Sequence, residues 1–198
     1  MVVKLTVREV QTELRPYIAK RWDSETMRGA PEQPELSPEL VAPLTVLSAI
    51  LRAVVESLPA ALASRLYRRV IQVMTQQLWD RVLAHRVWSA RGGAQLRHDL
   101  QYGFLHAARE ARVPSRALMR PWSKLLAGAA VLALPTAASG APEATSFEST
   151  TRATSEATDQ ELEKVLVDVG ESAGVDLKGH LTRADLSTLL KKRHDYWK

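Results

Sequence analysis

The sequence is most informative at first for what it lacks. It has no cysteine in 198 residues, which excludes disulfides and thiolate metal sites and suits a reducing compartment. Its longest uninterrupted apolar run, residues 125–134, is about half of the roughly 20 residues that a membrane-spanning helix needs, so we expect a buried helix and no transmembrane segment. Lys4, Arg8 and Glu9 interrupt the N-terminus, which therefore lacks the apolar core of a signal peptide.

Recognisable catalytic and cofactor motifs are also absent. No histidine forms a His-Glu-x-x-His pair, and the neighbours His98 and Asp99 point in different directions on a helix. Arg91-Gly92-Gly93 lacks the further glycine and the Gly-Lys-Ser/Thr of a phosphate loop, and no strand precedes it. The sequence offers no set of nucleophile, general base and acid that could form a catalytic site. We therefore expect no catalytic, cofactor-binding or metal-binding residue, no small-molecule substrate and no enzymatic activity.

Acidic residues are scarce through the middle of the chain. The formal charge is +5, but the arginines are concentrated between residues 60 and 121, where only Asp80, Asp99 and Glu110 oppose them. Residues 143–163 are acidic by contrast. Such a basic region indicates an anionic partner, whether nucleic acid, a membrane or an acidic protein. The alternative is a solvated arginine face on a helical bundle.

Strand-like alternation is lacking as well, and helical periodicity takes its place. Pro16 should kink or restart a first helix, and Ser37-Pro38-Glu39 has the composition of a helix start. A long helix is predicted over residues 60–88, and Gly92-Gly93 should form the corner between it and the next helix. Residues 23–37 have the composition of a loop. The apolar residues of the cleanest amphipathic helix are Leu40, Leu44, Leu47, Leu51, Val54 and Leu58.

The C-terminal third predicts a linker followed by a small helical unit. Residues 136–158 are rich in Ala, Ser, Thr, Gly and Glu, which predicts a disordered linker. Thr182 and Asp185 have the spacing of a capping box. We therefore expect an all-α fold: an irregular helical bundle over residues 1–135, the linker, and a helical hairpin over residues 159–198 that packs on the bundle.

The order of several motifs resembles one known family. Leu14-Arg15-Pro16-Tyr17 precedes Arg21-Trp22, and Leu78-Trp79-Asp80-Arg81-Val82-Leu83 precedes the stretch from Trp88 to Leu100. This order is similar to the C-terminal region of the RINT/Tip family, the vesicle-tethering subunits of the Dsl (NRZ) complex. The motif residues, expected to be structural, are Trp22, Trp79, Trp88, Gly92, Gly93, Gln95 and Asp99. Trp88 stands where the family usually has Phe, and Arg91 stands where small residues are common.

The resemblance implies a helical tether of the CATCHR type that acts in Golgi-to-ER retrograde transport. It implies a location in the cytoplasm, peripheral on the cytosolic face of the endoplasmic reticulum, and an ER SNARE of the Qb (Sec-twenty) type as partner. Family members are several times longer, so the chain would be a C-terminal region. Other Dsl/NRZ subunits would dock on the N-terminal regions that it lacks.

Three hypotheses remain open at this level. In the first, Arg65, Arg68 and Arg69 steer an acidic helix of a SNARE to a groove on the chain. In the second, the arginines and nearby tryptophans bind nucleic acid, which we consider unlikely because the arginines are spread over several predicted helices. In the third, the chain is a fragment without independent activity.

Overall fold

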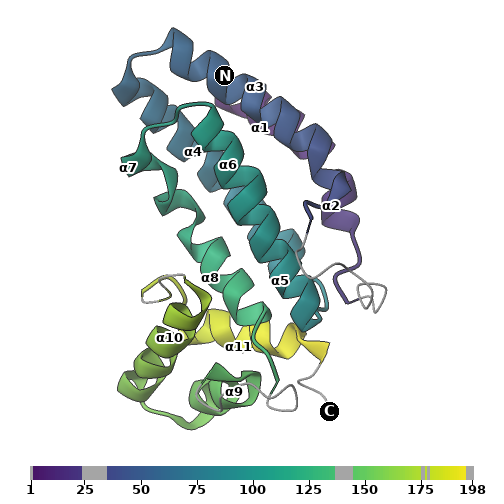
Figure 1. Ribbon diagram of the computed structural model, residues 1–198, viewed down its shortest axis with the longest axis vertical. Coiled ribbons are helices and arrows are strands. Elements are labelled where there is room, and N and C mark those ends of the chain that lie inside the picture. The colour runs from purple at the N-terminus through teal and green to yellow at the C-terminus, as the bar shows by residue number, and fades with distance from the viewer. Residues whose placement is uncertain (1, 24–34, 137–144, 175–176, 178, 195–198) are drawn as a thin grey trace. The chain divides into compact units, whose positions relative to one another are not determined.

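The computed structural model describes residues 2–23, 35–136, 145–174, 177 and 179–194, and Figure 1 shows its elements. Every regular element in these residues is helical, which confirms the all-α fold class. The one β-type contact among them is an isolated parallel bridge between Trp88 and Arg193. The chain forms two compact units that interleave along the sequence. Unit 1 comprises residues 1–20, 30–82 and 98–122, and unit 2 comprises residues 21–29, 83–97 and 123–198.

This division differs from the boundaries predicted from the sequence. Residues 83–97 and 123–135, assigned in the prediction to an N-terminal bundle, group with the C-terminal helices. The apolar helix within residues 123–132 is buried all round, so it needs neighbours on every side. These neighbours include the C-terminal helices, which the sequence predicts as a hairpin that packs on the bundle.

Unit 1 is built mainly from two long helices and the segments packed on them. Pro16 restarts the helix as predicted, because it stands near the start of a second short helix. The elements of unit 1 are α1 (Val2–Glu13), α2 (Arg15–Ala19), η2 (Pro38–Leu40), α3 (Val41–Ser57), α4 (Ala60–Leu78), the π-helical η4 (Asp99–Phe104), α6 (Leu105–Glu110), α7 (Ser115–Leu118) and η5 (Arg120–Trp122). The π-helical η3 (Trp79–Leu83) continues α4.

Aromatic side chains hold the interior of unit 1 together. The rings of Phe104 and Trp122 lie 5.1 Å apart, and Tyr17 meets Phe104 edge-on at 6.5 Å. The indole N–H of Trp122 donates to the Tyr67 hydroxyl at 2.9 Å, and that hydroxyl donates to the Leu118 carbonyl at 3.0 Å. The polar tips of these buried rings are therefore hydrogen-bonded, as burial of polar groups requires.

One helix of unit 1 is unusually apolar for its exposure. The helical stretch Pro38–Ser57 is 20 residues long and reaches a mean hydropathy of 1.7 over an 18-residue window, so by length and composition it could cross a membrane. Only 22% of that window is buried. Leu40, Leu47 and Leu51 face the interior, whereas Val41 is 65% exposed. The expectation of no spanning segment rests on the uninterrupted apolar run at 125–134, whereas the stretch 38–57 is longer and is interrupted by Arg52.

In unit 2 the most apolar helix packs against other helices of the same unit (Figure 1). Its elements are α5 (Ala90–His98), α8 (Ser123–Leu132), α9 (Phe147–Glu156), α10 (Asp159–Ala173) and α11 (Arg183–Lys192). Residues 125–132 of α8 are all buried, and α8 packs against α10 and α11. The predicted capping box of Thr182 and Asp185 is confirmed at the start of α11, and Thr158 and Glu161 form another at α10.

Part of the predicted linker is helical. Helix α9 lies within residues 136–158, where composition had indicated disorder, while residues 137–144 lie outside the described part. The Ser146 hydroxyl accepts a hydrogen bond from the Ser149 N–H and caps the helix. Phe147, Thr150 and Ala153 are buried against the rest of unit 2. A single aromatic residue and a good cap therefore order a segment whose mean composition is polar.

Candidate partner-binding site

The exposed face of α4 carries the arginines that the sequence singled out. Positions three and four apart lie on the same side of a helix, so Arg65, Arg69, Gln72 and Gln76 line up along one face. The opposite face is buried. Arg65, Arg68 and Arg69 are all exposed. The structure therefore places these three residues together at one end of a single polar helix face.

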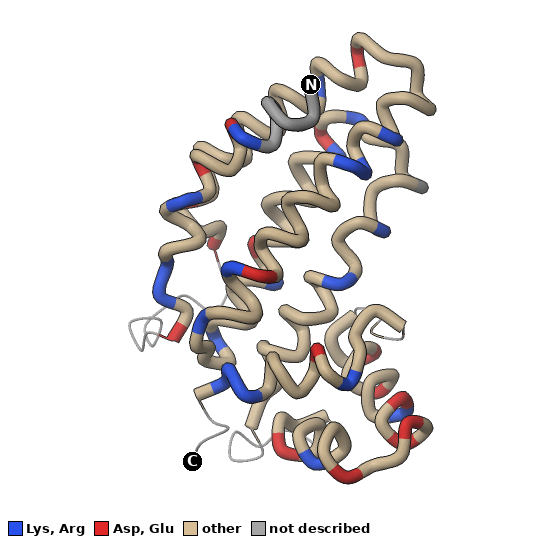
Figure 2. Tube along the Cα trace, turned by 180° about the vertical axis from the view of Figure 1, so that it is seen from behind, with Lys and Arg blue, Asp and Glu red and all other residues tan. Residues whose placement is uncertain are grey.

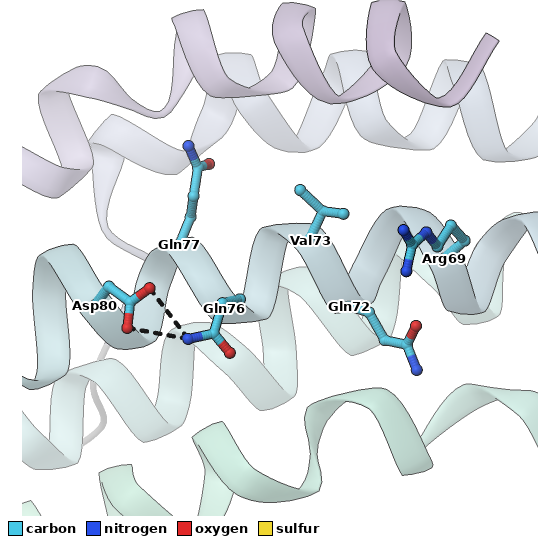
Figure 3. Close-up of a pocket in the computed structure, with 6 residues that line it drawn as sticks. All are labelled: Arg69, Gln72, Val73, Gln76, Gln77 and Asp80. Atoms are coloured by element: carbon cyan, nitrogen blue, oxygen red, sulfur yellow. Dashed lines mark hydrogen bonds between the residues drawn. The ribbon is translucent and has the colours of Figure 1, made fainter. Parts of the chain in front are cut away.

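A groove follows this face toward the end of α4 (Figure 3). Its volume is about 400 Å³. Its lining residues are Arg69, Gln72, Val73, Gln76, Gln77 and Asp80. The side-chain amide of Gln76 donates to both carboxylate oxygens of Asp80, at 3.0 and 3.1 Å, which fixes the two groups relative to each other. Such a groove presents amides, two opposite charges and the Val73 side chain to a partner, and its exposed lining is more apolar than polar.

Arg69 and Asp80 are the charged residues that line the groove, and Arg65 and Arg68 are exposed on α4 before it begins. Arg68 donates from Nε to the Ser64 carbonyl at 3.3 Å, and within the described residues none of the three arginines forms an ion pair. Asp80 stands at the far end. The carbonyl oxygen Oε1 of Gln77 is shielded from solvent and accepts no hydrogen bond from any described group. A helix that brings acids to the arginines and hydrogen-bond donors to the amides would complement this face.

The family-motif residues of unit 2 are packing residues. Trp22 and Trp88 are buried and their rings lie 4.8 Å apart. The Trp22 carbonyl accepts hydrogen bonds from the Ser89 N–H at 3.2 Å and the Ser89 hydroxyl at 3.1 Å. The Trp88 indole N–H donates to the Leu83 carbonyl at 3.2 Å. Gln95, half-buried on α5, lies in the same unit.

The prediction of a helix corner at Gly92-Gly93 is wrong. Both glycines lie inside α5, and the chain turns before it, at residues 84–89. A Cβ atom on Gly92 would collide with the Trp22 carbonyl, and one on Gly93 with the backbone of Leu132. These glycines therefore allow two backbones to approach closely. Glycine is common both at such contacts and in turns, so the sequence alone does not distinguish the two.

Trp79 and Asp99 belong to unit 1 and are also buried. Asp99 accepts hydrogen bonds from the Tyr17 hydroxyl at 3.0 Å, the Ser37 N–H at 3.0 Å and the Ser37 hydroxyl at 2.6 Å. Ser37 makes no side-chain cap to η2. His98 stacks on Tyr102 at 4.6 Å instead of engaging Asp99. Burial, followed by the charge of Asp99, raises the pKa of Tyr17 well above its usual 10.0.

Sequence reasoning missed two features. The groove glutamines share a helix face with Arg69, and their spacing of four residues could have indicated this.

Arg193 could not have been found, because it is one of several C-terminal basic residues. It is fully buried, donates to the carbonyls of Leu132 at 2.9 Å and Leu134 at 2.7 Å, and covers the Phe147 ring at 4.4 Å. It ties the end of the chain to α8 and α9.

The described residues contain no group of three or more His, Cys, Asp or Glu that could hold a metal ion. Neither a search of curated proteins nor a search of solved structures returns a significant match. A comparison with protein-family models matches the RINT-1/TIP-1 family over residues 1–193, nearly the whole chain. This match agrees with the order of motifs from Leu14 to Leu100 and with the all-helical fold. The chain belongs to the RINT-1/TIP-1 family.

Proposed function

We propose that this chain is a non-enzymatic module of a vesicle-tethering complex and that the α4 face binds a helical segment of a SNARE. Family membership supports a role in tethering and vesicle transport. We propose further that the chain acts in Golgi-to-ER retrograde transport at the cytosolic face of the endoplasmic reticulum. Its partners would be a Qb SNARE of the Sec-twenty type and other tether subunits. The observation that carries it is the groove on α4 with its exposed arginine end.

Helix-to-helix docking fits the chemistry of this face. The arginines offer unpaired positive charge for the acids of a partner helix, and electrostatic steering of this kind mainly raises the association rate. The amides of Gln72 and Gln76 offer donors and acceptors further along the same face. Gln77 Oε1 would gain a hydrogen bond only if a partner supplied a donor or the side chain rotated. Polar groups placed along a largely apolar groove favour a partner helix that matches both the charges and the apolar surface.

A titration with the cytosolic part of a Qb ER SNARE tests this proposal. The variant R65Q/R68Q/R69Q should bind at least roughly tenfold more weakly, mostly through a slower association rate that loses its dependence on salt. A matched control, R15Q/R52Q/R81Q, removes the same charge at exposed positions of unit 1 outside the groove. Equal weakening of both variants, or no binding by the unaltered chain at tens of micromolar, would contradict the proposal.

Nucleic-acid binding is the second candidate, and the burial of the tryptophans counts against it. Trp22, Trp88 and Trp122 are at most 1% exposed and are closed to stacking by bases. The exposed arginines are spread over several elements, among them α2, α3, α4, α6 and η5, instead of a single helix. A binding assay with single-stranded and duplex DNA at two salt concentrations would decide, because a nucleic-acid binder loses affinity steeply as salt rises.

A further inference from the structure

A second basic surface lies outside the groove, on the segment from Arg109 to Arg120. This segment carries four arginines in its sequence and a single acid, Glu110. It runs from the end of α6 through α7 to η5, and Figure 2 shows basic positions along it. Arg109, Arg112 and Arg120 are exposed, and none forms an ion pair within the described part of the chain. Its positive charge is therefore directed to solvent.

Arg112 occupies a backbone position that normally belongs to glycine. Its φ is 59°, and it is the only residue other than glycine with a positive φ among the described residues. The Val113 N–H donates to the Ala108 carbonyl at 3.1 Å and the Arg112 N–H to the Arg109 carbonyl at 2.8 Å. These two bonds form a Schellman motif, in which the left-handed residue is usually glycine because a Cβ strains it. An arginine at this position lowers the stability of the fold. Its presence there therefore suggests that the side chain has a function.

Apolar side chains are exposed on this segment and on α4, the helix that it contacts. Met119 is 45% exposed, and Leu62, at the start of the adjacent helix α4, is 49% exposed. The Tyr67 hydroxyl donates to the Leu118 carbonyl, and the buried Trp122 anchors the end of the segment. Helices α4 and α7 are in contact, so Met119 is held near the surface of α4. Neither Leu62 nor Met119 lines the groove.

We propose that residues 109–120 form a contact site for anionic phospholipid surfaces. The arginines would bind lipid phosphates, and the apolar tips of Met119 and Leu62 would enter the boundary between headgroups and acyl chains. An acidic peptide fits less well. The exposed arginines are spread over a helix end, a turn and a 3-10 helix with exposed apolar tips between them, whereas a bound helix needs a groove such as the one on α4. This site is independent of the proposed SNARE contact.

Sedimentation with vesicles tests the proposal. The chain should bind vesicles of phosphatidylcholine and phosphatidylserine, but not vesicles of phosphatidylcholine alone. Basic residues near an anionic surface each contribute roughly fivefold in affinity, so R109Q/R112G/R120Q should bind on the order of a hundredfold more weakly. The control R15Q/R52Q/R81Q, which removes the same charge, should keep most of its binding. Met119→Ser should weaken the binding that persists at high salt.

The single variant R112G separates function from folding. Glycine relieves the strained backbone, so its melting temperature should stay the same or rise while vesicle binding falls several-fold. Equal binding of R109Q/R112G/R120Q and the unaltered chain would overturn the proposal and would point to the apolar helix α3. Binding to an acidic peptide that competes fully with vesicles for this segment would also overturn it. The variant R65Q/R68Q/R69Q should lose SNARE binding and keep most vesicle binding.

Discussion

The carboxylate of Asp99 and the hydroxyl of Tyr17, 82 residues apart in the sequence, are joined by a buried hydrogen bond of 3.0 Å. Ser37 adds two further bonds to the same carboxylate. Lys20 donates to the Ser37 hydroxyl at 2.7 Å and pairs with Glu39 at 3.2 Å. This network ties α2 and the start of η2 to η4 within unit 1. It satisfies a fully buried acid with donors from distant segments.

We expect Asp99→Ala to lower the free energy of unfolding by about 3 kcal/mol, because three buried donors lose their acceptor. Tyr17→Phe should cost less, about 1.5 kcal/mol, since Asp99 keeps both bonds from Ser37. Urea unfolding measures both changes. Tyr102→Phe is the matched control, because Tyr102 is 60% exposed and should have no measurable effect. A Tyr17→Phe variant as stable as this control would show that the network contributes nothing.

Gly93→Ala should destabilise unit 2 by more than about 2 kcal/mol. A methyl group at residue 93 would collide with the backbone of Leu132 and Ala133, which cannot move aside as a flexible side chain can. Gly103→Ala serves as the control. The nearest atoms that a methyl group there would meet belong to side chains, those of Leu44, Leu36 and Leu40 at 3.2, 3.3 and 3.7 Å. The melting temperature of Gly93→Ala should therefore be clearly lower than that of Gly103→Ala. Equal melting temperatures would refute the close-approach role.

Arg193→Ala should cost about 3 kcal/mol, since the carbonyls of Leu132 and Leu134 lose a buried donor and Phe147 loses its cation–π contact. Arg193→Lys should recover only part of this loss, because an ammonium group cannot reproduce the planar guanidinium geometry. Hydrogen exchange should show earlier opening of α9 in both variants. An unchanged exchange rate in α9 would mean that Arg193 does not hold it.

Acid should weaken the N-terminal caps of α10 and α11. Hydrogen bonds from Thr158 lower the pKa of Glu161. Burial alone would raise the pKa of Asp185, but bonds from Thr182 and Lys124 outweigh it and lower the pKa below 3.8. A lowered folded-state pKa adds stability that is present above the unfolded-state pKa and is lost as pH falls through the folded-state value. Thr182→Ala should therefore cost about 1 kcal/mol of unfolding free energy at neutral pH, and less as pH falls through the lowered pKa of Asp185, where the bond from the Thr182 hydroxyl to the carboxylate is lost. A cost independent of pH would contradict this.

Alkali should weaken unit 1 through its buried tyrosines. Burial raises the pKa of Tyr67 from 10.0 to about 12, although the hydrogen bond from Trp122 opposes the shift. The unfolded chain releases this proton first, so stability is intact below pH 10 and falls as pH rises toward 12. The loss from Tyr67 is roughly 2 to 3 kcal/mol. Tyr67→Phe should flatten the decline between these pH values, as measured by urea unfolding; an unchanged slope would contradict it.

The local features of the fold were predictable from short stretches of sequence. Helical periodicity, the restart at Pro16 and the capping box at Thr182 depend on neighbours within one or two turns, so the residues themselves contain the information. The order of motifs across the chain also sufficed to identify the family. The exposure of Arg65, Arg68 and Arg69 followed from their place on one amphipathic helix.

Tertiary structure decided the rest, because it depends on what meets each residue from far along the chain. Gly92 and Gly93 could mark a turn or a close approach, and only the position of the Trp22 and Leu132 backbones distinguishes the two. The apolar contacts of Phe147 and the buried guanidinium of Arg193 order a segment that its polar composition assigned to a linker. Likewise, the left-handed backbone of Arg112 appears only in the folded turn, where the strain exists. The composition of a segment limits how much apolar surface it can bury. The segments that pack against it determine how much of that surface is buried in the fold.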